Sequence, residues 1–410
     1  MKKLFALLLS LAMVLALVAC GQKDPTPDTP DTPDDPQTKV EYKVAMITDY
    51  GDITDQSFNQ TTYEACKAFA EDNSIEFSYF KPAGDNTADR VAMIEKAVDE
   101  GFNVIVMPGY AFGGAIVEAA PEFPDVKFIA LDVAAGDLLE TAVAKAGEAY
   151  DYTPENWDLN KYVDMSNVYC AVYQEELCGY MAGYAAVKLG YKSLGFLGGM
   201  SVPAVVRYGY GFVQGVDAAA ADLGLTDVKL NYIYGGQFFG DADITAVMDT
   251  WYQGGTEVVF ACGGGIYTSA VDAAKKVGAK VIGVDVDQAG VIANYAGVDG
   301  MTVTSAMKGL YPATYDTLTD VIVNGNWEKY VGKIETLGLV SGTDPEANYV
   351  QIPMGDGTQW SDSFTQDDYK AMVKDMFDGK ITVSNNTSSD VSAADFATVI
   401  TVDDQGSIKG

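Results

Sequence analysis

Short apolar runs alternate with longer amphipathic stretches along most of the chain. Runs of β-branched and other apolar residues that are too short for helices predict strands, and the segments with helical spacing between them predict helices. We predict strands at 43–48, 76–80, 103–107, 127–131, 167–172, 193–197, 229–234, 257–261, 280–284 and 301–304. We predict helices at 57–72, 88–100, 114–122, 175–189, 205–223, 243–253, 268–277 and 311–323.

This alternation of strands and helices indicates an α/β fold. Strands that are apolar throughout and separated by helices favour parallel sheets that are covered on both faces. The series is longer than one doubly wound sheet usually takes, so we expect two lobes, each with its own sheet. Because ligands of such folds bind beyond the carboxyl ends of the strands, we expect the site in a cleft between the lobes.

The start of the chain follows a different pattern. A cationic beginning and an apolar stretch that ends at Ala19 are typical of an export signal. Small residues before Cys20, with Gly21 after it, form a lipobox. We therefore expect residues 1–19 to be a signal peptide and Cys20 to carry the lipid that anchors the protein to the extracytoplasmic face of the cell membrane. The alternative is a transmembrane anchor, but the apolar stretch is shorter than the ~20 residues that span a bilayer.

Residues 20–41 combine this cysteine with many prolines, aspartates and threonines, which predicts an extended tether. The whole chain carries a formal net charge of −32, and so acidic a surface repels nucleic acids and anionic lipid headgroups. We therefore expect no nucleic-acid partner, and a ligand that is neutral or cationic.

Two residue types narrow the chemistry further. The chain has no histidine, which removes catalysis by a histidine base and zinc sites with histidine ligands. We expect neither a metal nor a cofactor. The cysteines at 66, 170, 178 and 262 lie in apolar segments without CxxC spacing, which favours buried free thiols, with a disulfide as the open alternative.

Acidic residues, glycines and aromatic residues recur where the predicted strands end. Asp49, Asp132 and Asp285 each end a strand, and Gly263 begins a run of three glycines. One such acid can simply cap a helix, but several along one sheet edge indicate a site. The glycine run lacks the lysine and the spacing of a phosphate-binding loop, so we expect it to approach a neutral ligand closely.

Six segments in a fixed order carry a family resemblance. They read DYG with DQSFNQ at 49–60, FIALD at 128–132, ELCGYMAG at 176–183, FLGGM at 196–200, GVDVDQ at 283–288 and TSAMK at 304–308. Together they cover about residues 43 to 325, and the chain resembles the basic membrane protein family. These are bacterial lipoproteins related to the purine nucleoside receptor of ABC transporters.

The resemblance implies a fold like that of type I periplasmic binding proteins, with two doubly wound parallel-sheet lobes, a hinge and an interlobe cleft. In that layout lobe 1 takes 42–172 and 301–325, and lobe 2 takes 173–300 and 326–410. The implied function is that of a receptor rather than an enzyme. It would close on a purine nucleoside-like ligand and present it to an ABC permease that is driven by ATPase subunits.

The resemblance also assigns a ligand-binding set, which is Asp49, Phe58, Asn59, Asp132, Phe238, Gly263, Asp285 and Lys308. Two aromatic side chains would stack on the purine, one of them Phe58 and the other Phe238, with Phe239 as its competitor. Acidic and amide groups of lobe 1 would bind the base, and Asp285 with Lys308 would bind the sugar. The structural alternatives are a core position for Phe58, a helix cap for Asp132 and a surface charge for Lys308.

Two regions depart from the family pattern. The segment 134–166 is longer than expected, so that it could cover the mouth of the cleft, and the chain beyond about residue 330 is individual. These departures leave a sugar or another neutral hydroxylated metabolite as the alternative ligand. From other classes of protein, a secreted glycosidase and a surface sensor remain alternatives.

Overall fold

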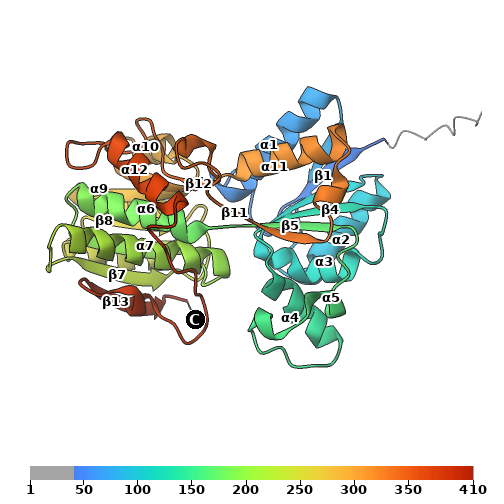
Figure 1. The fold of residues 1–410 in the computed structure, drawn as a ribbon, viewed down its shortest axis with the longest axis horizontal. Coiled ribbons are helices and arrows are strands. Elements are labelled where there is room, and N and C mark those ends of the chain that lie inside the picture. The colour runs from blue at the N-terminus through green and yellow to red at the C-terminus, as the bar shows by residue number, and fades with distance from the viewer. Residues whose placement is uncertain (1–40, 410) are drawn as a thin grey trace, which may run out of the picture. The chain divides into compact units, whose positions relative to one another are not determined.

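The computed structural model describes residues 41–409, so the predicted signal peptide, Cys20 and nearly all of the tether lie outside the described residues. The described chain contains two sheets that are built from alternating strands and helices (Figure 1). We call each sheet with the helices that cover it a lobe. The two-sheet α/β fold that the hydrophobic pattern predicts is confirmed.

Lobe 1 contains six parallel strands in the order β11-β5-β4-β3-β1-β2. The strands are β1 (Lys43–Ile47), β2 (Glu76–Phe80), β3 (Val104–Pro108), β4 (Lys127–Leu131), β5 (Val168–Tyr173) and β11 (Lys333–Leu337). Its helices are α1 (Phe58–Asn73), α2 (Thr87–Asp99), α3 (Gly113–Ala119), α4 (Ala135–Lys145), α5 (Leu159–Tyr162) and α11 (Leu310–Leu318). Alternate residues of β1 enter different cores, Val44 and Met46 on one face and Ala45 and Ile47 on the other, so both faces are covered.

Lobe 2 contains seven strands in the order β12-β10-β9-β8-β6-β7-β13, all parallel except β12. They are β6 (Ser193–Gly198), β7 (Lys229–Tyr234), β8 (Val258–Cys262), β9 (Lys280–Asp285), β10 (Thr302–Lys308), β12 (Val350–Gln351) and β13 (Thr401–Ser407). The helices are α6 (Glu175–Lys188), α7 (Pro203–Asp222), α8 (Ala242–Gln253), α9 (Tyr267–Val277), α10 (Ala289–Ala296) and α12 (Gln366–Phe377).

Two strands lie in the lobe opposite to the one that the family layout implied. The layout placed 301–325 in lobe 1, but β10 pairs with β9 in lobe 2, and the chain does not return to lobe 1 until Gly309, just before α11. It also placed everything from 326 onward in lobe 2, but β11 pairs with β5 in lobe 1. The physical reason is that β10 continues the parallel series of lobe 2, whereas β11 is a half-polar edge strand whose pattern does not predict a strand.

The segment 134–166 does not cover the cleft. It forms α4, α5 and a short 3-10 turn, with α4 packed against α3 of lobe 1. The cysteines at 66, 170, 178 and 262 are buried and free, as predicted. Among residues 41–409, none of the helices has both the length and the apolar character needed to cross a membrane.

Candidate functional site

A cavity of about 370 Å³ lies where the carboxyl ends of strands from both sheets meet. Its walls contain all eight residues of the predicted ligand-binding set, namely Asp49, Phe58, Asn59, Asp132, Phe238, Gly263, Asp285 and Lys308. The structure thus brings the whole set together, half of it from each lobe, although the contact of each residue with a ligand stays a prediction. No residue of 134–166 contributes to the walls.

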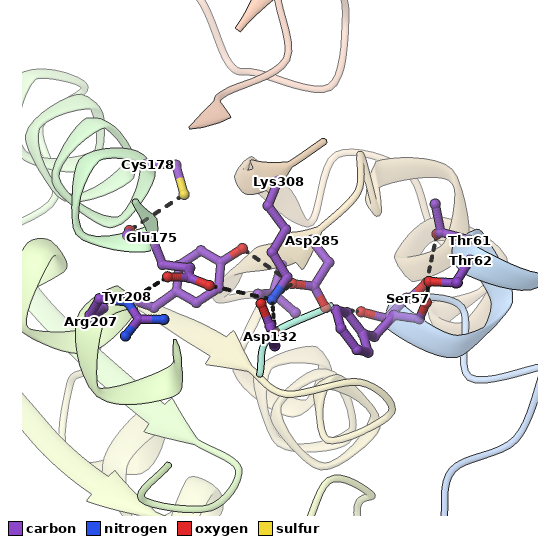
Figure 2. A network of polar contacts seen from close by, with 12 residues as sticks. Ser57, Thr61, Thr62, Asp132, Glu175, Cys178, Arg207, Tyr208, Asp285 and Lys308 are labelled. Carbon is purple, nitrogen blue, oxygen red and sulfur yellow. Dashed lines mark hydrogen bonds and ion pairs between the residues drawn. The ribbon is translucent and has the colours of Figure 1, made fainter. Parts of the chain in front are cut away.

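Lys308, the last residue of β10, is the buried cation of the site (Figure 2). Its Nζ lies 2.5 Å from Asp132 Oδ2 in lobe 1, 3.6 Å from Glu175 Oε1 and 3.8 Å from Asp285 Oδ1. Burial by itself lowers the pKa of Lys308, but the carboxylates of Asp132, Asp285 and Glu175 outweigh burial and raise that pKa above its ordinary range. Lys308 is therefore a buried, charged group with three carboxylate partners, and the alternative of a surface charge is wrong.

Asp132 and Asp285 occupy equivalent places at the carboxyl ends of β4 and β9. Both have left-handed backbone conformations, with φ of 59° and 64°, which residues with a side chain adopt at a cost in free energy. Asp132 is not the cap of α4, since Ala134 holds that position. Its Oδ1 is buried without a hydrogen-bond partner, which leaves one acceptor of this carboxylate unused.

Asp285 links the lobes directly. Its Oδ2 accepts a hydrogen bond of 2.5 Å from Ser57 Oγ of lobe 1, and its Oδ1 accepts one of 3.1 Å from Tyr208 of α7. Gln288 Nε2 of lobe 2 also donates to the backbone oxygen of Gln56 at 3.2 Å. With the pair between Lys308 and Asp132, these contacts hold the lobes together around the cavity.

Asp49 and Asn59 form the polar wall of lobe 1. Asp49 Oδ1 accepts hydrogen bonds from the backbone N–H groups of Tyr50 and Gly51, both 2.6 Å, and from Asn59 Nδ2 at 3.3 Å. Burial nevertheless raises the pKa of Asp49. Asn59 Oδ1 is buried without a partner, so it is a second unused acceptor in the cavity wall.

The aromatic walls come from both lobes. Phe58 begins α1, packs against the cores of both lobes and lies under Lys308, whose Nζ is 4.5 Å from the ring centroid. Phe238 packs onto Gly199 and Gly263, where an added Cβ would lie 2.4 Å and 2.9 Å from its ring, so both positions require glycine. Phe239 also lines the cavity but is 58% exposed.

Three residues of this network were missed from the sequence. Glu175 is fully buried and accepts a 2.6 Å hydrogen bond from Arg207 Nε, and Tyr208 holds Asp285 (Figure 2). Arg207 and Tyr208 lie inside α7, and Glu175 begins α6. None of them directly follows a predicted strand, so the rule that located the acids of the site does not find them. The one available signal was the ELCGYMAG segment, which starts immediately after Glu175.

The donor set of the site does not suit a metal. Within residues 41–409 no group of acidic or cysteine side chains is arranged to hold a metal ion. Asp132, Glu175 and Asp285 instead share Lys308 as their cation, and Glu175 also pairs with Arg207. The cavity wall thus offers a ligand a pair of unused acceptors and several aromatic side chains, among them Phe58 and Phe238.

Comparison with known proteins identifies the family that the chain matches. Residues 42–343 match the family model described as "ABC transporter substrate-binding protein PnrA-like". A "nucleoside-binding protein BmpA" of an ABC transporter in Lactococcus lactis is 25% identical, over 92% of this chain and 96% of its own length. "Basic membrane protein B" of Borreliella burgdorferi is 26% identical, over 76% of this chain and 83% of its own length.

Solved structures show the same fold. A solute-binding protein of an ABC transporter from Aeropyrum pernix has a TM-score of 0.60 at 20% identity, over 83% of this chain and 87% of that protein. One from Conexibacter woesei has a TM-score of 0.58 at 20% identity, over 84% of this chain and 99% of that protein. These similarities confirm the two-lobed fold that the motifs imply.

Proposed function

Because the chain belongs to the PnrA-like family of ABC transporter substrate-binding proteins, which are receptors and not enzymes, we propose that it binds a purine nucleoside-like ligand in the cavity between its lobes. The ligand would enter an open form, and the contacts that both lobes make with it would favour closure. The closed form would then dock on an ABC permease whose ATPase subunits supply the energy for transport. In this proposal Cys20 carries a lipid that keeps the receptor at the outer face of the membrane.

The observation that carries the ligand class is the combination of aromatic faces with unused acceptors. Phe58 and Phe238 offer stacking surfaces from the two lobes, and a stacked aromatic pair adds about 0.5–1.5 kcal/mol beyond the area it buries. Asp132 Oδ1 and Asn59 Oδ1 are buried acceptors that favour a ligand with N–H groups in its plane. The cavity of about 370 Å³ is at the small end of the range for small-molecule sites.

The sugar part would bind around Asp285. A carboxylate accepts hydrogen bonds from two neighbouring hydroxyls well, and charge-assisted bonds are the stronger kind. In the structure the two carboxylate oxygens of Asp285 already accept hydrogen bonds from the hydroxyls of Ser57 and Tyr208. The hydroxyls of a ribose would compete with these two donors or displace them. The "nucleoside-binding" name of the Lactococcus lactis relative supports this assignment.

The test is calorimetric titration of the purified full chain, in detergent, with inosine, adenosine, guanosine, free ribose and glucose. We expect nucleoside binding that Asp285→Ala weakens about 10- to 100-fold, because a hydrogen bond to a charged group contributes about 1.5–3 kcal/mol. Asp287→Ala is the matched control, since Asp287 is exposed and does not line the cavity.

The same titration separates the alternatives. Binding of free sugars together with silence from every nucleoside would establish the sugar receptor instead. Silence from both classes would leave the surface sensor as the better model.

A further inference from the structure

A second feature of lobe 2 reaches the aromatic wall from outside. Residues 401–409, which we call the strap, consist of β13 and the two residues after it. The strap pairs in parallel with β7, and the backbone N–H of Ile408 donates to Tyr234 O at 2.8 Å. It ends beside residues 235–241, the aromatic loop, which joins β7 to α8 and carries Phe238 and Phe239.

The aromatic loop has few backbone anchors of its own. Gly235 and Gly236 donate to the backbone oxygens of Gly198 and Gly199 at 2.7 and 2.8 Å, and Gly265 N–H donates to Phe238 O at 2.9 Å. These bonds fix the backbone of Gly235 and Gly236 and the carbonyl group of Phe238. At the other end of the loop, the backbone N–H of Asp241 donates to Ser269 Oγ at 3.0 Å, and Asp241 Oδ1 accepts from the N–H of Ile244 at 2.9 Å. The order of the residues between these ends depends on further side-chain contacts.

Lys409 provides several of those contacts. Its Nζ donates to Gln237 Oε1 at 2.8 Å and pairs with the carboxylate of Asp241. Gln237 Nε2 in turn donates to Phe239 O and to Asp241 Oδ2, both at 2.9 Å. The three side chains form one closed group that spans the aromatic loop.

The fit between strap and loop is close in the backbone as well. A Cβ at Gly236 would lie 2.7 Å from Lys409 Cβ and 2.9 Å from Lys409 O, and the residue has a φ of 79°, so only glycine is accommodated there. The strap thus lies directly on the loop and does not merely approach it. The family model ends at residue 343, so the family match does not account for this contact.

We infer that the strap is a positioning device for the aromatic wall, in which Lys409 holds residues 235–241 in the conformation that presents Phe238 and Phe239 to a planar ligand. The inference rests on the proposed function for the identity of that ligand, but not for the ordering of the loop. A loop that is ordered before binding loses less conformational entropy when a ligand arrives, which raises affinity without any new contact.

The expected size of the effect follows from exposure. The Lys409 side chain is 35% exposed and that of Asp241 is 26% exposed. Ion pairs with this degree of exposure contribute little to the free energy of unfolding. Removing Lys409 should therefore change the order of the loop and the affinity for ligand, with little change in the melting temperature of the protein.

The first experiment needs no ligand. Hydrogen exchange is measured by mass spectrometry on the full chain and on Lys409→Met, with Lys409→Arg to restore two donors. We expect faster exchange in peptides that contain 235–241 and Gly265 in the methionine variant, and recovery in the arginine variant. Lys380→Met is the matched control, since this exposed lysine is paired with Asp375 and Asp378.

The second experiment measures nucleoside affinity of the same variants. Lys409→Met should raise the Kd about 3- to 10-fold, mainly through faster dissociation, while Lys380→Met should leave it unchanged. Gln237→Met cuts the same group from the loop side, so adding Lys409→Met to it should have little further effect.

The outcomes separate the two proposals. The inference that the strap positions the aromatic loop would be wrong if hydrogen exchange at 235–241 were unchanged in Lys409→Met. It would also be wrong if the Kd rose no more in Lys409→Met than in Lys380→Met. Faster exchange at the loop in a protein that binds no nucleoside would support the strap and reject the proposed ligand.

Discussion

Buried acids outnumber buried bases beside the cavity. Glu175 and Glu176 are 0% and 2% exposed, and each has one carboxylate oxygen that accepts no hydrogen bond. With Asp132 and Asp285 they face only Lys308 and Arg207 as cations. Unpaired buried acids cost free energy, and such arrangements gather at functional sites.

This imbalance predicts a pH-dependent stability. Burial, with the neighbouring Glu175 as second cause, raises the pKa of Glu176 from 4.5 to about 7. A raised pKa means that the folded state holds the proton of Glu176 more tightly than the unfolded state does. The stabilisation that this proton gives the folded state is therefore complete below pH 4.5 and is lost as the pH rises through about 7. We expect Glu176→Gln, which stays neutral, to be more stable than the unchanged chain at pH 8 by up to about 3 kcal/mol, and to gain little at pH 4.

Denaturant unfolding at several pH values measures this difference. The exposed Glu118→Gln serves as control and should show the slope of the unchanged chain. Burial also raises the pKa of Asp137 to about 7, so a smaller slope should persist in Glu176→Gln. Because the chain has no histidine, no side chain of ordinary pKa titrates between pH 6 and 8 and adds its own pH dependence to the measured stability. A difference in the free energy of unfolding between Glu176→Gln and the unchanged chain that does not grow with pH would contradict this account.

At the residue scale, the acids of the site were predictable because parallel strands bring their carboxyl ends to one sheet edge. Asp49, Asp132 and Asp285 follow directly from that rule, whereas Phe58 and Asn59 needed the family motif. Arg207 and Tyr208 could not be predicted, since helical periodicity distinguishes a buried face from an exposed one but does not show what a buried polar side chain meets.

Among the elements, the pair of α6 and α7 makes the closest backbone approach. A Cβ at Gly211 or Gly215 of α7 would lie 2.1 Å from the backbone oxygen of Glu176 or Tyr180 in α6. A Cβ at Gly179 of α6 would lie 2.3 Å from Tyr208 O. The glycines of both helices let the backbones touch, and this contact holds Glu175, Arg207 and Tyr208 at one end of the pair.

We therefore expect Gly215→Ala to destabilise the protein by about 1–3 kcal/mol, the usual penalty of overpacking a core. Gly290→Ala is the matched control, since Gly290 lies in α10 with no atom within 4 Å of an added Cβ. That substitution should be neutral or stabilising by up to about 1 kcal/mol through helix propensity. Equal unfolding midpoints of the two variants in urea would show that the close approach is unimportant.

The strands that the pattern did not predict, β11, β12 and β13, all lie at the edges of their sheets. The edge strands β11 and β13 expose polar residues, as in KIETL and TVDDQGS, so neither has the apolar run that identifies a central strand. The helices α4, α5, α10 and α12 were not predicted either. The helices α4 and α5 lie in the segment 134–166, which departs from the family pattern. The helix α10 is short and almost wholly apolar, so its sequence lacks the polar face that identifies an amphipathic helix.

On the scale of the whole molecule, charge decides how the protein can stay at a membrane. A formal net charge of −32 opposes contact with anionic headgroups, so the protein surface itself gives no electrostatic attachment. Attachment would then depend entirely on the proposed lipid at Cys20.

Cys20→Ser should for that reason move the protein completely from the detergent phase to the aqueous phase in a phase-partition assay with Triton X-114. Cys66→Ala, which changes a buried thiol of lobe 1, should partition like the unchanged chain. Retention of the serine variant in the detergent phase would rule out the lipid anchor and favour an uncleaved apolar stretch.

The two late strands have a consequence for when the protein can fold. Tyr169 of β5 donates to Glu335 of β11 across 166 residues of sequence, and the N–H of Thr398, just before β13, donates to Asp217 across 181 residues. The sheet of lobe 1 cannot complete its edge before residues 333–337 are available, and that of lobe 2 not before residues 401–407. Such distant pairings form slowly. For a chain with the export signal proposed above, such late edges would delay the completion of both sheets and so favour passage across a membrane in an unfolded state.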